Sequence, residues 1–197
     1  MKQPLLPLFA AAVGIAAVVT GCATQPSSDE LDRQARAAVQ ASFRDQGIAK
    51  VSRLNQDAMQ AACSSDKPPS KAVEDQIMAD ARASVKWPAG GRFIGDWREG
   101  ERLAQSGRGL TWTDPSAATK DNGGNCYNCH QISKAELSYG TIGPSLLAYG
   151  RNRGVTDLSA PSAQAMIEYT WIRIYNAKAF NACSTMPRFG HEGMLDT

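Results

Sequence analysis

Apolar side chains recur every four positions along the N-terminal part of the chain, which is the spacing of one helix face. Ser27 and Glu30 stand in front of the first stripe as a capping box, and Gly47 ends it. The three stripes are Leu31, Ala35, Val39 and Phe43; Leu54, Ala58 and Ala62; and Val73, Ile77, Ala81 and Val85. The pattern predicts three helices, the third bounded by the turn at 68–70 and the proline- and glycine-rich break at 87–91.

Two further stretches of the chain are amphipathic. Residues 96–104 predict a short helix, and Gly100 within it suggests close approach of another backbone, because glycine otherwise weakens a helix. Residues 162–177 predict a longer helix with its large apolar side chains on one side. Glycine, proline and asparagine turns between them predict a long loop over 107–124. These periods together indicate an all-α chain.

The first 21 residues have the features of an export signal. Lys2 supplies a charge, an apolar run follows, and Val19-Thr20-Gly21 places small residues before Cys22. This ending resembles a bacterial lipobox, which predicts a lipoprotein signal peptide over 1–21 and a lipidated Cys22. An uncleaved anchor is the alternative, because the apolar run approaches the roughly 18 residues that span a bilayer. The expected location is the periplasm, with the chain anchored to a membrane by lipid.

Composition limits the remaining possibilities. The chain has 197 residues, 43% of them hydrophobic, which suits one globular domain with additions. Its formal charge of +2, with both signs mixed throughout, argues against nucleic acid as a partner. We expect a tether over 22–28, a helical extension over 29–88 and the main domain over 89–197. The extension holds no histidine and no catalytic constellation.

The motif at 126–130, Cys-Tyr-Asn-Cys-His, carries the clearest chemistry. It is the attachment pattern of c-type haem, in which the sulfurs of Cys126 and Cys129 add to the vinyl groups and His130 ligates iron. A thioredoxin-type redox pair would need a strand-helix-strand setting that the pattern lacks, and a zinc site would need two further nearby ligands. The sequence therefore predicts one covalently attached haem c.

The five cysteines can then be divided by role. Cys22 is the expected lipidation site, and Cys126 and Cys129 are the expected haem attachment sites. The remaining two, Cys63 and Cys183, would form a disulfide in an oxidising compartment. A free reactive thiol or an iron ligand at Cys183 is the alternative, because the sequence does not reveal exposure or pKa.

Residues after the motif resemble a class I cytochrome c. The segment 140–146, Gly-Thr-Ile-Gly-Pro-Ser-Leu, is similar to the element whose proline carbonyl accepts the other ring hydrogen of the haem histidine. The resemblance implies that Pro144 orients His130, which would fix the imidazole plane and tautomer.

The same resemblance implies a sixth iron ligand on the loop after the last helix. Met186 lies just before a proline, as distal methionines of the class often do. His191, Met194 and an open site are the alternatives. A thioether ligand raises the reduction potential relative to a second imidazole, which suits an electron acceptor.

Four segments taken together resemble the SoxX family, the small monohaem cytochrome subunit of bacterial thiosulfate-oxidising SoxAX complexes. They are 124–131, 140–146, 175–177 and 182–191. The resemblance implies a heterodimer with a SoxA-type haem subunit, on which thiosulfate is oxidatively joined to a cysteine of a sulfur-carrier protein. This chain would then pass electrons to a small periplasmic acceptor and would not be catalytic alone. A general lipid-anchored electron carrier of a respiratory chain is the alternative.

One departure from the class concerns the last helix. Class I domains end in a helix that crosses the first one, whereas this sequence stops eleven residues after Met186. We therefore expect the C-terminal helix to be missing through truncation, because an uncovered apolar face around Gly100 and Leu103 would be destabilising.

Overall fold

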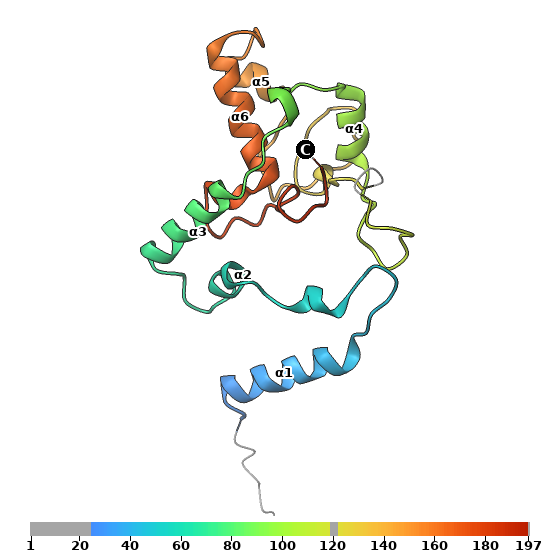
Figure 1. Ribbon diagram of the computed structural model, residues 1–197, viewed down its shortest axis with the longest axis vertical. Helices are drawn as coiled ribbons and strands as arrows, with labels where there is room; N and C mark the ends of the chain where they lie inside the picture. The colour runs from blue at the N-terminus through green and yellow to red at the C-terminus, as the bar shows by residue number, and fades with distance from the viewer. Residues whose placement is uncertain (1–24, 119–121, 197) are drawn as a thin grey trace, which may run out of the picture. The chain divides into compact units, whose positions relative to one another are not determined.

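The computed structural model describes residues 25–118 and 122–196 (Figure 1). Within these ranges the chain is helical and forms no strand, which confirms the predicted all-α class. The elements, with η for a 3-10 helix, are α1 (Ser28–Ser42), η1 (Val51–Leu54), α2 (Ala58–Cys63), α3 (Lys71–Ala83), η2 (Ala89–Gly91), α4 (Trp97–Gln105), η4 (Cys126–Asn128), α5 (Tyr149–Asn152), α6 (Pro161–Tyr175) and η5 (Ala177–Ala179).

The chain divides into two compact units, residues 1–42 and residues 43–197. The sequence-based boundary after residue 88 does not coincide with this division. Residues 43–88 belong to the second unit because α3 packs against η5, which follows α6. Most of the expected helical extension is thus part of the same unit as the 126–130 motif.

In the first unit, the helix α1 has no buried residue. The Ser27 hydroxyl accepts a hydrogen bond from the Glu30 N–H at 3.2 Å, which is one half of the predicted capping box. The Glu30 carboxylate instead pairs with Arg33 and accepts from the Gln34 side chain at 2.7 Å. The start of α1 is therefore capped by the serine hydroxyl together with local side-chain pairs.

The second predicted helix is divided in two. Leu54 ends η1, and α2 begins only after Asp57, whose carboxylate accepts from the Gln60 N–H at 2.7 Å. The Gln60 side chain accepts in return from the Asp57 N–H at 2.9 Å, which completes a capping box. This local cap starts a new helix and overrides the apolar period that joined Leu54 to Ala58.

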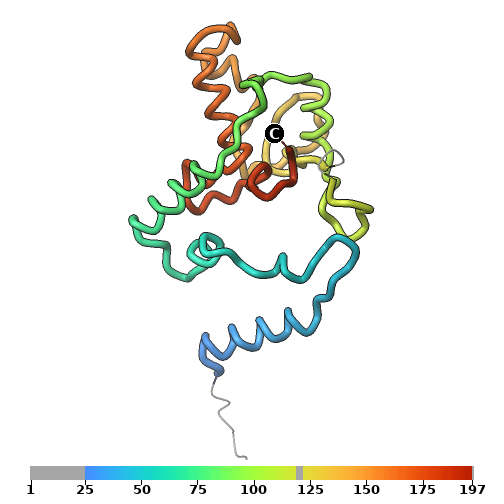
Figure 2. Tube along the Cα trace, viewed as in Figure 1, coloured from blue at the N-terminus to red at the C-terminus, as the bar shows by residue number. Residues whose placement is uncertain are grey.

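The third predicted helix, α3, is joined to the C-terminal stretch through polar and small side chains. Arg82 donates from Nε and Nη2 to the Ala179 carbonyl at 3.1 and 3.0 Å. Asn176 donates to the Ser84 hydroxyl at 3.2 Å. Ala81 is buried in this contact. Figure 2 traces how the chain after α6 returns to lie along α3.

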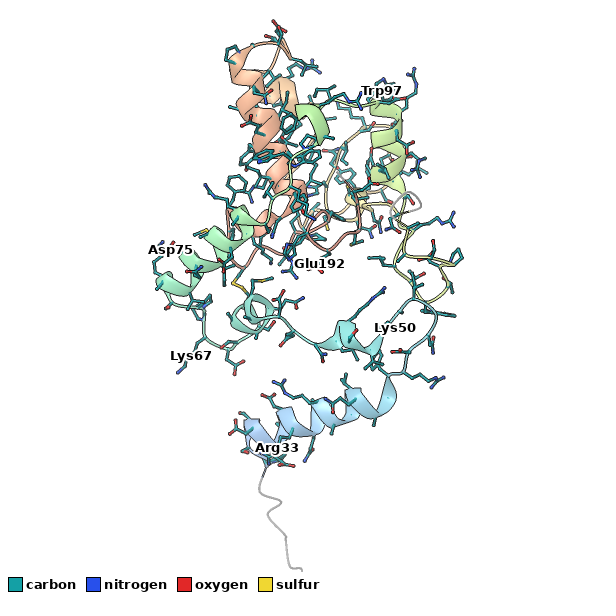
Figure 3. The ribbon with its side chains drawn as sticks, viewed as in Figure 1. Arg33, Lys50, Lys67, Asp75, Trp97 and Glu192 are labelled. Atoms are coloured by element: carbon teal, nitrogen blue, oxygen red, sulfur yellow. A yellow bond between two sulfur atoms is a disulfide. The ribbon has the colours of Figure 1, made fainter. Side chains whose placement is uncertain are left out.

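The helix α4 presents an open face. The Asp96 carboxylate caps its start by accepting from the Arg98 N–H at 2.9 Å. Apart from the neighbouring residues and the backbone of α4 itself, no described atom lies within 4 Å of a Cβ added at Gly100, so the described residues do not make the close approach expected there. Trp97 on this helix is 64% exposed (Figure 3). No helix follows η5 in the part of the chain that the structure describes.

The core is built from small and aromatic side chains. Among the described residues, no leucine, isoleucine, valine, methionine or tryptophan is buried. The buried apolar residues are Ala81, Tyr127, Ala163, Tyr175, Ala177, Ala179, Ala182 and Phe189. A unit of this size normally buries large aliphatic side chains, so its protein atoms alone supply an unusually small apolar core.

Candidate haem site

The two cysteines and the histidine of the 126–130 motif lie on one tight turn. The Cys129 and His130 N–H groups both donate to the Cys126 carbonyl, at 3.1 and 2.9 Å. Asn125 introduces this turn in the left-handed conformation, with φ of 47°. The thiols of Cys126 and Cys129 are free and half-buried. The turn therefore holds two thiols and an imidazole within five residues.

The imidazole of His130 is fixed by the segment that follows the motif. Its Nδ1 lies 2.7 Å from the Pro144 carbonyl oxygen. Because a carbonyl can only accept, Nδ1 carries a hydrogen, and in the neutral form of the ring Nε2 has the free lone pair that a metal can bind. The structure thus brings together Pro144 and His130, the pair that the class I resemblance implied.

Three backbone hydrogen bonds hold the 140–146 segment against the motif. The N–H groups of Gly140, Gly143 and Leu146 donate to the carbonyls of Tyr127, Cys129 and Gln131 at 2.8, 2.9 and 2.7 Å. This ladder places the Pro144 carbonyl opposite the imidazole without depending on any side chain of the segment.

Gly143 is a site residue that the sequence did not reveal. A Cβ added there would lie 2.2 Å from Cε1 and 2.5 Å from Nδ1 of His130. The signal that could have revealed it is the Gly-Pro pair itself, since only glycine lets the backbone approach the ring so closely.

We expect Gly143→Ala to displace the imidazole and weaken its bond to the Pro144 carbonyl. The histidine would then be poorly oriented for a metal, and loss of the group that orients a metal-binding histidine typically costs about 10–100-fold in metal affinity or activity. Measurement of the fraction of chain that carries haem, by intact mass and visible spectrum, checks this. The matched control is Gly95→Ala, where an added Cβ meets no atom within 4 Å and the backbone φ is not positive. Equal haem content in both variants would contradict the prediction.

The C-terminal segment lies beside the motif. A Cβ added at Gly124 would be 3.0 Å from Cys126 Sγ and 3.8 Å from Phe189 Cε1. Asn122, which is 1% exposed, donates from Nδ2 to the Met194 carbonyl at 2.8 Å. Asn122 falls in the loop predicted over 107–124, and its burial comes with this long-range contact. The residues before Cys126 therefore pack on the chain after Met186.

The three candidates for a sixth ligand divide between two cavities. Met186 and Met194 both line a cavity of about 490 Å³ that Met59 also borders. His191 lines another, of about 450 Å³, formed mainly by α2 and α3. His130 borders neither of these two cavities. The role of Met186 as an iron ligand therefore stays a prediction.

Cys63 and Cys183 are joined by a disulfide, with their Cα atoms 5.4 Å apart. This is the pair expected from the division of the cysteines by role. Cys183 is consequently neither a free thiol nor available as an iron ligand in this structure.

Three observations bear on which group the 126–130 motif could hold. Burial raises the pKa of the Cys126 thiol, whereas the attacking cysteine of a redox pair has its pKa lowered. The described residues contain no group of three or more histidine, cysteine, aspartate or glutamate side chains that could hold a metal ion. A large apolar group could be attached at this turn, which offers two free thiols and an oriented imidazole. Such a group would also suit a core without large aliphatic side chains.

Comparison with known proteins finds a similar lipoprotein but no matching family model. No protein-family model matches the chain. The chain is similar to an uncharacterized lipoprotein of Aquifex aeolicus, with 36% identity over 146 residues. These residues are 71% of this chain and 63% of the relative, so the chain spans less than two thirds of that protein's length.

The predicted lipid site, Cys22, and the signal peptide before it lie outside the described residues. In the ranges that are described, no helix has both the length and the apolar character needed to cross a membrane.

Proposed function

We propose that this chain is a lipid-anchored monohaem cytochrome c that serves as the electron outlet of a SoxAX-type thiosulfate-oxidising complex. The observation that carries the haem assignment is the pair of free thiols on one turn with His130, whose Nδ1 is bonded to the Pro144 carbonyl.

Each residue of the site has a distinct role in this proposal. Cys126 and Cys129 would each form one thioether bond through Sγ, which makes the cofactor permanent. His130 would ligate iron through Nε2, while Pro144 holds the ring and its tautomer. Met186 is the proposed sixth ligand. The bound group would supply one-electron iron chemistry, and the chain would set its orientation and reduction potential.

The sulfur-oxidation role rests on the four segments that resemble SoxX. In that arrangement the new sulfur–sulfur bond forms on a SoxA-type partner, and two electrons leave one at a time through this chain to a small periplasmic acceptor. The lipoprotein relative supports membrane anchoring through Cys22. The proposed location is therefore the periplasmic face of a membrane.

The proposed function predicts that thiosulfate reduces the haem only in the presence of a SoxA-type partner. The detergent-extracted protein is mixed with thiosulfate and a sulfur-carrier protein, with and without the copurified multi-haem subunit, and the reduced haem band is followed. A Met186→Ala variant serves as a control that keeps the attachment motif.

Two results would contradict this function. Reduction by a respiratory electron donor, with no multi-haem subunit copurifying and no response to thiosulfate, would favour a general electron carrier. A reduced-minus-oxidised spectrum without a c-type band would remove the haem assignment itself.

A further inference from the structure

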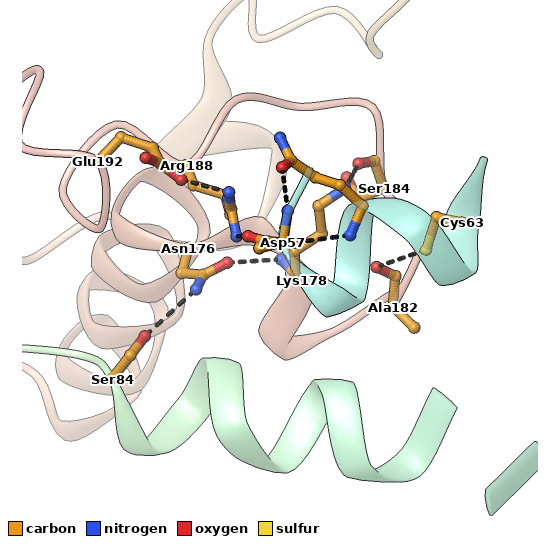
Figure 4. A network of polar contacts seen from close by, with 10 residues as sticks. Asp57, Cys63, Ser84, Asn176, Lys178, Ala182, Ser184, Arg188 and Glu192 are labelled. Atoms are coloured by element: carbon orange, nitrogen blue, oxygen red, sulfur yellow. Dashed lines mark hydrogen bonds and ion pairs between the residues drawn. The ribbon is translucent and has the colours of Figure 1, made fainter. Parts of the chain in front are cut away.

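The loop that carries Met186 is fastened to α2 on both sides. Three residues before the methionine, Cys183 forms the disulfide to Cys63 in the last turn of α2. Two residues after it, Arg188 donates from Nη1 to the Asp57 carboxylate at 2.8 Å. Asp57 is the N-cap of the same helix. Figure 4 shows Asp57, Cys63 and Arg188 together with their polar contacts.

The Arg188 contact is partly shielded from water. The Arg188 side chain is 12% exposed and pairs with both Asp57 and Glu192. Burial opposes ionisation of Asp57, but hydrogen bonds from the Gln60 N–H and from Arg188 hold the pKa of that carboxyl below its ordinary value. The carboxylate is therefore charged at neutral pH and serves α2 and the Met186 loop at once.

A third attachment leads from the same loop to η5. Lys178 donates from Nζ to the Ser184 carbonyl, and the Ser184 hydroxyl accepts from the Met186 N–H at 3.3 Å. The 3-10 helix η5 is itself bound to α3 by the two hydrogen bonds from Arg82 to the Ala179 carbonyl. These three attachments of residues 183–188 therefore lead to α2 or to η5, which packs on α3.

We propose that α2 is a clamp that positions Met186, with Asp57, Cys63, Cys183 and Arg188 as its positioning residues. This inference rests on the proposed function, because it assigns the clamp to the sixth ligand of the haem. Only residues 184–187 lie between the two attachments, so few conformations of the methionine remain once both are made. In this proposal α2 supplies no iron ligand, but it helps to determine whether Met186 is bound to the iron.

The test measures how readily an added ligand competes with Met186. In the full-length holoprotein, exogenous imidazole binds ferric iron only in the fraction of molecules whose sixth position is open. Because the Asp57 side chain is 45% exposed and water weakens the pair, Arg188→Gln should raise the apparent imidazole affinity about two- to fivefold. Asp57→Asn should act in the same direction and keep α2 capped, because asparagine is an equally good N-cap.

The matched control is Arg33→Gln, which removes an exposed ion pair with Glu30 in α1. The charge-transfer band of methionine-ligated ferric haem should weaken in the two clamp variants and stay unchanged in this control. Covalent haem content is measured in every variant by intact mass, so that loss of the group is separated from loss of the ligand.

The possible results distinguish failure of the clamp proposal from failure of the proposed function. A chain that carries no covalent haem would overturn both. Attached haem with methionine ligation, together with imidazole affinity unchanged in Arg188→Gln and Asp57→Asn, would overturn the clamp alone. An equal increase in the Arg33→Gln control would also overturn it, since the effect would then be one of general stability.

Discussion

Replacement of both Cys126 and Cys129 by serine is expected to leave the chain without covalent haem and to unfold much of its second compact unit. The thioether bonds need the sulfurs, which are free in the structure. The apolar core of protein atoms is small, with no buried leucine, isoleucine, valine, methionine or tryptophan among the described residues. An attached haem would stand in for several such side chains, each worth about 1.5–3 kcal/mol when buried.

The expected loss in the free energy of unfolding is therefore at least about 5 kcal/mol, which is the whole stability of many domains. Intact mass and a reduced-minus-oxidised spectrum report the haem, and circular dichroism reports the fold. Asn128→Ala is the matched control, because Asn128 lies in the same turn and is exposed. A serine variant that melts at the temperature of the unaltered chain would show that the second unit folds without its cofactor.

The features that sequence predicted best are those set by local chemistry. The 126–130 motif, the Gly-Pro segment and the four-residue apolar period all act over a few positions, and α1 and α3 lie close to their predicted ranges. The Cys63–Cys183 pair could also be predicted from the sequence, because only these two cysteines remained after the other three had been assigned roles.

Contacts between residues far apart in the sequence could not be predicted from such local patterns. Arg188 and Asp57 are separated by 131 positions, and nothing near either residue indicates the other. The burial of Asn122 depends on the distant Met194 carbonyl in the same manner. The division of the second predicted helix had a local cause, the Asp57 and Gln60 capping box, which the apolar period concealed. What sequence missed is therefore the network that holds the site together.

Replacement of both Cys63 and Cys183 by alanine is the second large effect that we expect. The disulfide closes a loop with a sequence separation of 120, for which the chain-entropy model gives up to about 5 kcal/mol. A unit of this size loses about 2–4 °C of melting temperature per kcal/mol, so Tm should fall by about 10–20 °C. Thermal unfolding of the holoprotein measures this, and alkylation with and without reductant confirms the bond in the starting material.

The location of the disulfide adds a sharper expectation than stability alone. Because Cys183 and Arg188 fasten one loop to one helix, the alanine pair and Arg188→Gln should not act independently. Once the disulfide is gone, the ion pair alone keeps the loop on α2, so the combined variant should lose more methionine ligation than the two effects added. A double-mutant cycle on imidazole affinity measures this coupling. Strict additivity would mean that the two attachments hold separate parts of the chain, and that Met186 is positioned without the cooperation of α2.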